Sequence, residues 1–358
     1  MYNMKKKEII IIGFAVILFM WFSINILYQT GFDKNIDFDI ASKYGALLGG
    51  VFSFLSVWLI YLTLRKQSEV YDKTLFENRF FELVRFHRAN VEELPPYQKY
   101  IPQKDKRFKK EEIYRERQHI FNELFWQIME SIKVYDSFMK DKDYCLPDIL
   151  NAQGINYYEK LEEKFKQRKF NTEEIIRIEI AYLILFFGIG IGENSTNYTQ
   201  KILKKKYNDE FVTLLMDYFK EEISKKQRER GYFAGQQVRL GHYFRHLYQT
   251  VKYVDKQDFN YSKKYEYIKL YRAQFSTFEQ AIIFFNSLSE LGKNWEFSQE
   301  KENDMLITKY NLIKNIPPEL ISVIDIKKYY PKVIYEFDSE QTEERKELER
   351  KELEKKYK

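Results

Sequence analysis

The chain has 358 residues, of which 44% are hydrophobic and 31% charged, and its formal net charge is +6. This length and apolar fraction allow one large domain or two modest ones with a hydrophobic core, and the net charge is mild because basic and acidic residues are interleaved. The single cysteine, Cys145, excludes an internal disulfide framework and fits a reducing cytoplasm.

Two apolar segments close to the N-terminus are each long enough to cross a lipid bilayer, at about residues 9–28 and 44–64. Lysines occupy positions 5–7, the intervening loop 31–43 contains three aspartates, and basic residues occupy positions 65–66. Because positive charge favours the cytoplasmic side, this pattern predicts a transmembrane hairpin with both ends of the chain in the cytoplasm. We therefore expect a multi-pass protein of the plasma (inner) membrane.

The second span contains Gly45 and Gly49 in a Gly-x-x-x-Gly spacing, which makes one helix face small enough for close contact with another helix. Packing against the first span of the same chain and self-association into a homo-oligomer are both compatible with this pattern. Neither span contains an ionisable residue, which argues against an ion pathway built by one copy.

The residues after the membrane hairpin (1–64) predict an all-helical cytoplasmic domain at 65–337 and a charged, helical or disordered tail at 338–358. The second span is expected to continue as a helix up to Pro95. His87 falls on the apolar face of that helix, where a satisfied core histidine is the simpler interpretation. The connector 95–110 is basic, so contact with anionic lipid or nucleic acid and a solvated loop are alternative interpretations.

Further helices are predicted from apolar residues that recur every three or four positions. Their ranges are 111–139, 157–169, 175–191 and 199–230, and residues 329–337 form the one predicted strand. The segment 175–191 is the most apolar, and Asn171 is a suitable N-cap for it. Its uninterrupted apolar part is too short for a bilayer, so we interpret it as a central core helix and not as a third span.

The stretch 241–286 sets polar residues into strongly helical, aromatic sequence. A helix through residues 240–254 would carry an apolar stripe on one face and His242 and His246, one turn apart, on a neighbouring face. Two imidazoles at this spacing provide half of a metal site, but no His-Glu-x-x-His motif or cysteine pair accompanies them. We therefore expect no bound metal and no cofactor, and favour histidines that hydrogen-bond to another helix.

The residues Ser276-Thr277-Phe278-Glu279 have the sequence of a capping box, in which the serine and glutamate bond each other's backbone amides at a helix start. Asn286 lies on the same helix face as Glu279. Gly292, which follows Leu291, is expected to end the helix with a left-handed backbone conformation. Arg272 ends the preceding helix, so an arginine, a carboxylate, an amide and the histidine pair could converge. Such a group is either a buried structural network or a catalytic one.

Two segments of this stretch resemble the signature of the phage abortive infection family, the AbiC-like proteins of bacteria. They read Gly241-His242-Tyr243-Phe244-Arg245-His246-Leu247-Tyr248 and Tyr271-Arg272-Ala273-Gln274-Phe275-Ser276, the second followed by Glu279 and by Phe285-Asn286. The resemblance extends from about Phe80 to about Pro317, and Phe275 stands where leucine is expected. It implies a bacterial antiviral protein that acts when a phage infects, often by stopping the host cell.

The resemblance implies no particular reaction, and the candidate catalytic residues are His242, Arg245, His246, Arg272, Glu279 and Asn286. No hydrolase, phosphate-loop or Cys-x-x-Cys motif is present. We therefore expect a membrane-anchored effector or sensor of infection, leaning away from an enzyme, with a phage or host protein as its trigger. The alternative is a membrane-tethered nuclease or other hydrolase that uses His242, His246, Arg272 and Glu279.

Overall fold

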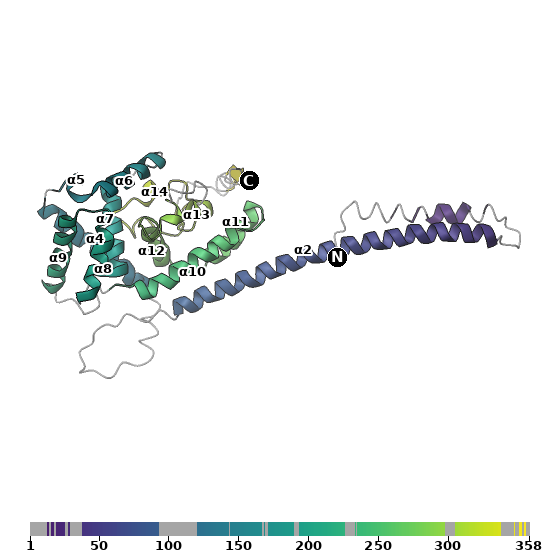
Figure 1. The fold of residues 1–358 in the computed structure, drawn as a ribbon, viewed down its shortest axis with the longest axis horizontal. Coiled ribbons are helices and arrows are strands. Elements are labelled where there is room, and N and C mark those ends of the chain that lie inside the picture. The colour runs from purple at the N-terminus through teal and green to yellow at the C-terminus, as the bar shows by residue number, and fades with distance from the viewer. Residues whose placement is uncertain are drawn as a thin grey trace, which may run out of the picture. The chain divides into compact units, whose positions relative to one another are not determined.

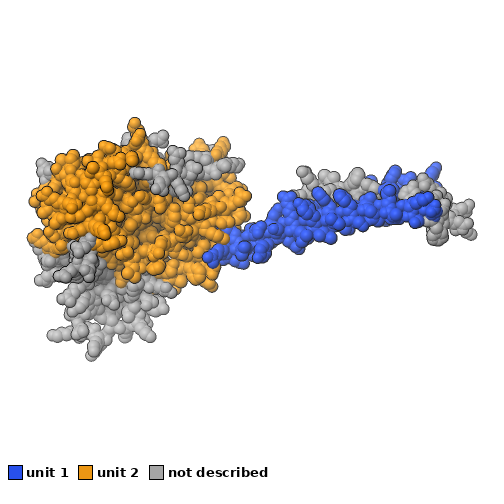
Figure 2. Space-filling view, viewed as in Figure 1, with its two compact units in different colours: residues 1–79 blue, residues 80–358 orange. Residues whose placement is uncertain are grey.

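The computed structural model describes residues 13, 16–17, 19–25, 28, 38–92, 120–142, 144–166, 168, 171–189, 193–225, 233, 235–297, 305–337, 347, 351–352 and 354–355. The chain divides into two compact units, residues 1–79 and residues 80–358, coloured separately in Figure 2. Nearly half of the predicted first span, the whole connector 95–110 and most of the charged tail lie outside the described residues.

The longest element is the helix α2, Phe38–Glu92, which continues without interruption for 55 residues (Figure 1). At 1.5 Å per residue it is about 80 Å long. The predicted extension of the second span toward Pro95 is therefore confirmed. A search of the described residues for helices long and apolar enough to cross a membrane finds one, Gly45–Glu92, whose most apolar window has a mean hydropathy of 2.0 and is not buried.

The described residues of the predicted first span are helical where the structure places them, including residues 19–25. Phe19 belongs to this segment and Phe52 to α2, and their ring centroids lie 5.8 Å apart in an edge-on contact. An aromatic contact of this kind holds two helices against each other. Within residues 1–79 the two predicted spans therefore touch each other.

The core of residues 80–358 is built on α4 (Ile120–Asp141), α7 (Thr172–Phe187) and α12 (Thr277–Ser287), which pack against one another (Figure 1). Asn171 caps α7 as predicted, because its side chain accepts a hydrogen bond from the Glu174 amide. Gly188 ends this helix with a φ of 80°, a conformation that favours glycine. Every residue of α7 from Ile178 onward is buried, so the predicted core helix is confirmed.

The remaining helices surround this core. They are α5 (Leu146–Ile149), α6 (Ala152–Lys164), α8 (Glu193–Leu203), α9 (Asp209–Lys225), α10 (Gln237–Asp255), α11 (Tyr261–Arg272), the 3-10 helix η1 (Lys293–Trp295), α13 (Leu306–Tyr310) and α14 (Ile326–Tyr329). The single helix predicted over 199–230 is wrong, because α8 and α9 are separated by a turn. There the Asn151 amide donates to the Lys206 carbonyl at 3.0 Å, and the Asn208 amide donates to Ile149 at 2.9 Å.

The strand predicted over 329–337 is also wrong. The chain forms the short helix α14 up to Tyr329 and then a series of turns. Single hydrogen bonds hold those turns in place: the Ile334 amide donates to the Asn311 side chain, and the Glu336 amide donates to the Lys314 carbonyl.

Candidate functional site

Helix α10 carries the first motif and places its polar residues in two different environments. Its apolar stripe is buried as predicted: Leu240, Tyr243, Phe244, Leu247, Val251 and Val254. His246 is half-buried beside the stripe, whereas His242 and Arg245 are exposed. The two histidines one turn apart therefore do not share one site.

Helix α12 begins with the predicted capping box. The Ser276 amide donates to Glu279 Oε2 at 2.7 Å, and the Glu279 amide donates to Ser276 Oγ at 3.2 Å. The other carboxylate oxygen, Oε1, accepts a hydrogen bond from the Tyr243 hydroxyl at 3.1 Å. Glu279 is 4% exposed, so burial and these three bonds give it a structural role at the junction of α10 and α12.

His87, near the end of α2, is buried against this junction. Its Nδ1 atom lies 3.2 Å from the Tyr271 hydroxyl, and its Nε2 atom lies 3.6 Å from Glu279 Oε1. The second distance is too long for a hydrogen bond, so Nε2 is a buried nitrogen without a hydrogen-bond partner. The prediction that His87 is a core histidine is confirmed, but only one of its two nitrogens is satisfied.

His246 binds the same part of α2 through the main chain, because its Nε2 lies 2.9 Å from the Leu83 carbonyl oxygen, to which it can donate. Its ring is stacked on His87, with centroids 6.4 Å apart. Burial lowers the pKa of His246, the Leu83 carbonyl works in the opposite direction, and His87 lowers the pKa further. His246 is therefore an interfacial histidine that hydrogen-bonds to another helix, as the favoured interpretation proposed.

Arg272 does not join Glu279. At the end of α11 its guanidinium donates from Nη1 to the Tyr310 carbonyl oxygen at 2.8 Å and to the Asn311 carbonyl oxygen at 3.1 Å. Asn311 has a φ of 51° and ends α13, where carbonyl groups lack partners within the helix. The buried Arg272 side chain therefore satisfies the end of α13.

Asn286 is also held by other partners. Its Nδ2 donates to the Tyr182 hydroxyl at 2.9 Å, and its Oδ1 accepts from Trp295 Nε1 at 3.1 Å. The predicted left-handed stop at Gly292 is wrong, because its φ is −112°. Glycine is required there for space: a Cβ at this position would lie 2.2 Å from the Asn286 carbonyl oxygen.

A second buried polar group lies outside the two sequence motifs. Glu179 interrupts the apolar sequence of α7, and its carboxylate binds the hydroxyls of Tyr158 and Tyr207 and the Lys206 ammonium, the latter at 2.8 Å. Burial lowers the pKa of Lys206, but Glu179, Tyr157 and Glu290 together raise it by more, so the net direction is upward. A glutamate inside an otherwise apolar core helix was the sequence signal, because a buried charge requires a partner.

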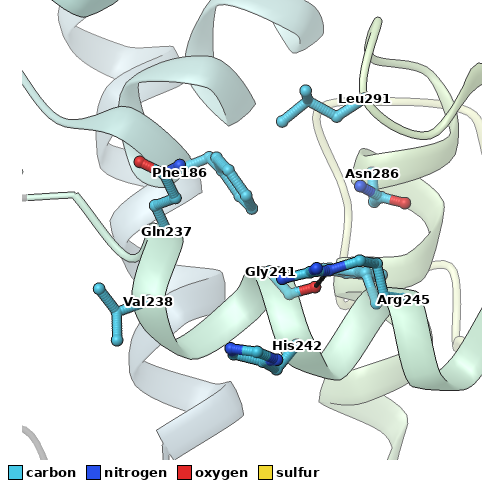
Figure 3. A pocket seen from close by; sticks show the side chains of 9 residues that line it. Phe186, Gln237, Val238, Gly241, His242, Arg245, Asn286 and Leu291 are labelled. Carbon is cyan, nitrogen blue, oxygen red and sulfur yellow. Dashed lines mark hydrogen bonds between the residues drawn. The ribbon is translucent and has the colours of Figure 1, made fainter.

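The exposed side of α10 borders a pocket of about 620 Å³. Its lining consists of Phe186 at the end of α7, Gln237, Val238, Gly241, His242, Phe244 and Arg245 of α10, Asn286 of α12, and Leu291. Figure 3 shows His242, Arg245 and Asn286 around the same space, with Phe186 and Leu291 on its other sides. Of the six candidate residues, these three are brought together at an accessible place.

The geometry defines what each group can do chemically. Glu279, His87 and Tyr243 are closed off in the core, so a substrate in solvent does not reach them. Across the part of the chain that the structure describes, no group of three or more His, Cys, Asp or Glu side chains is placed to hold a metal ion. The accessible pair, His242 and Arg245, offers hydrogen-bond donors and positive charge, the chemistry of anion recognition.

Comparison with known families finds a match over the motif helices. The family model described as "Putative phage abortive infection protein" matches residues 235–321, which contain α10, α11 and α12. The resemblance drawn from the two sequence motifs is therefore confirmed, over a shorter segment than the expected Phe80 to Pro317. Comparisons with curated proteins and with solved structures gave no match.

Proposed function

We propose, from the family likeness of residues 235–321, that this chain is an anti-phage protein of abortive infection, an effector or infection sensor anchored in the bacterial plasma membrane and acting from its cytoplasmic face. The observation that carries the proposal is that the matched segment contains both motif helices and the accessible pocket residues His242 and Arg245. A phage or host protein is the expected trigger.

The membrane part of the proposal is supported by α2. Most of its large apolar side chains between residues 52 and 64 are exposed, among them Phe54 and Ile60, as is expected of a helix surrounded by lipid. Basic residues at 5–7 and 65–66 favour a cytoplasmic location for both flanks of the hairpin. The contact of Phe19 with Phe52 is consistent with two spans that pack together.

A phage challenge tests the antiviral role. The full chain is expressed in a susceptible bacterial host, with a copy lacking its start codon as the control, and a panel of phages is applied at low and high ratios of phage to cells. We expect fewer plaques and surviving cultures at the low ratio. At the high ratio, growth should stop while few progeny phages are released. Equal plaque numbers and equal progeny release in both strains across the panel would contradict the role.

Reporter fusions test the location. A reporter that is active only in the cytoplasm and one that is active only outside are fused in turn to the C-terminus of the full chain. We expect signal from the cytoplasmic reporter alone. Signal from the external reporter alone would overturn the proposed orientation, whatever the outcome of the phage challenge.

A further inference from the structure

The pocket beside α10 has the chemical character of a binding site. We propose that it binds a small phosphate-bearing organic molecule of nucleotide size, with the phosphate held by Arg245 and His242 and the organic part against Phe186 and Leu291. This inference goes beyond the antiviral role and does not depend on it, because it concerns binding to the folded chain.

The charge of the lining favours an anion. Arg245 and His242 are exposed and line the pocket, and the described lining residues include no aspartate or glutamate. Arg245 Nε donates to the Gly241 carbonyl at 3.1 Å, which orients the guanidinium and leaves its terminal amino groups available. Among the described residues Arg245 forms no ion pair, so none of the carboxylates that the structure describes neutralises its charge. A guanidinium with free amino groups is well suited to two oxygens of one phosphate.

Two further sources of donors face the same space. Gln237 and Val238 form the first turn of α10, where backbone amides lack partners within the helix, and the N-cap Gln236 provides no side-chain bond to them. Independently of the helix end, Asn286 is 3% exposed, and its amide nitrogen donates one hydrogen bond, to Tyr182. An amide nitrogen carries two protons, of which the bond to Tyr182 uses one, and Asn286 lines the pocket in Figure 3.

The size and the apolar walls indicate an organic ligand and not a bare ion. A pocket of about 620 Å³ is much larger than inorganic phosphate, and it falls within the range of roughly 300 to 1,000 Å³ that is common for small-molecule sites. Phe186, Val238, Phe244 and Leu291 give it apolar surface. A nucleoside phosphate combines an anionic group with a flat organic body, and both halves of the pocket would then be used.

The test measures binding to the full chain in nanodiscs of zwitterionic lipid. The probes are orthophosphate, the nucleoside 5′-mono-, di- and triphosphates, and the corresponding nucleosides without phosphate; the readouts are calorimetry and the melting temperature. We expect at least one nucleotide to bind and to raise the melting temperature, because a ligand that binds only the folded state stabilises it. Orthophosphate and the free nucleoside should each bind more weakly than that nucleotide.

Two variants and one control locate the binding. Arg245→Gln removes the charged donors and should weaken nucleotide binding roughly 10- to 100-fold, the range for a hydrogen bond to a charged group. Gly241→Leu should abolish binding, because its side chain would extend into the pocket, while its Cβ comes no closer than 3.9 Å to Phe186 and requires no backbone shift. Lys256→Gln removes one exposed charge from the other end of α10 and should bind as the parent does.

Several outcomes would overturn the inference. One is that no nucleotide binds, and another is that Gly241→Leu folds and still binds it with parental affinity. If orthophosphate binds as tightly as the nucleotide, the organic part contributes nothing to binding, and the inferred ligand class is wrong. Anionic lipid in the nanodisc could also raise the melting temperature in the absence of nucleotide. If Gly241→Leu loses that increase, the pocket binds a lipid headgroup and not a nucleotide.

Discussion

Arg272 illustrates how a single buried side chain acquires its role from its partners. Among the described residues it donates to the carbonyl oxygens of Tyr310 and Asn311 and forms no ion pair with an acid. Its removal therefore takes a charged donor away from two buried carbonyls, of which that of Asn311 keeps a hydrogen bond from the Lys314 amide at 3.2 Å. We expect Arg272→Ala to lower the free energy of unfolding by about 1.5 to 3 kcal/mol, the range for hydrogen bonds that involve a charged group. Urea unfolding of the full chain in detergent measures this value.

Arg245→Ala is the matched control for that variant. Arg245 is exposed, and substitution of an exposed residue is expected to change the stability by about 0.5 kcal/mol or less. Equal unfolding free energies for the two variants would show that the carbonyl contacts of Arg272 contribute nothing. A loss of phage protection by Arg245→Ala at parental stability would instead indicate a functional role for the exposed arginine.

A second single residue, His246, should make the free energy of unfolding depend on pH. The pKa of His246 in the folded protein is lowered, chiefly by burial. In the unfolded chain this pKa is about 6.5. At a pH between the two values, the unfolded chain therefore binds more protons than the folded protein does. The contribution of His246 to stability is therefore complete above about pH 6.5 and is lost as the pH falls through the folded pKa. We expect His246→Gln to reduce the decrease in unfolding free energy between about pH 7 and pH 5.

His242 provides the comparison, because it is exposed on the same helix one turn away. His242→Gln is the matched control variant, because it replaces an exposed imidazole of the same helix by the same side chain. Parallel pH profiles for the parent and His246→Gln would contradict the interfacial role of His246, whereas a flattened profile in both variants would point to a general loss of native structure at low pH.

At the scale of elements, the turn between α12 and η1 and the second turn of α10 contain glycines with opposite requirements. A Cβ at Gly292 would meet the Asn286 carbonyl oxygen at 2.2 Å, whereas a Cβ at Gly241 meets nothing closer than 3.9 Å. Gly292→Ala should therefore destabilise the fold by about 1 to 3 kcal/mol through overpacking. Gly241→Ala should stabilise it by about 0.5 to 1 kcal/mol, because alanine favours a helix interior.

Thermal unfolding of the two variants side by side measures this difference. Since φ at Gly292 is −112°, alanine can adopt the backbone conformation, and any loss reports on the close approach to Asn286. A Gly292→Ala melting temperature equal to that of the parent would mean that the turn after α12 relaxes freely. The position of Asn286, and with it one wall of the pocket, would then not be fixed by this turn.

At the scale of the whole molecule, a charge in the second span separates the possible topologies. Phe54 lies at the centre of the span predicted at residues 44–64 and is 68% exposed. An arginine at the centre of a membrane helix costs about 3 kcal/mol. With two spans, Phe54→Arg should leave the first span inserted and place the C-terminus of a measurable fraction of chains outside the cytoplasm, as detected by the paired C-terminal reporters.

If α2 were the only span, the same variant would release the chain from the membrane instead, and alkaline extraction of membranes would recover it in the soluble fraction. Tyr71→Arg is the control, because Tyr71 lies on the same helix beyond the predicted span and is 67% exposed. This variant should insert as the parent does. Parental topology and membrane content in Phe54→Arg would show that residues 44–64 are not a span.

The sequence by itself determined the features that depend on near neighbours along the chain. The cap of α7 by Asn171 and the capping box of Ser276 and Glu279 join residues three positions apart. The buried stripe of α10 follows from helical periodicity. Local geometry fixes such contacts, so residue type and spacing suffice to predict them.

Only the tertiary structure decided which polar residues meet. His87 reaches Tyr271 across 184 positions of sequence, and Arg272 reaches Tyr310 across 38, whereas Arg272 and Glu279, close in sequence, have different partners. The break between α8 and α9 likewise depends on a distant segment, residues 149–151. Helical spacing gives the direction in which a side chain leaves its own helix, but the packing of other helices determines what lies there, because each buried polar group must find a partner in the space that remains.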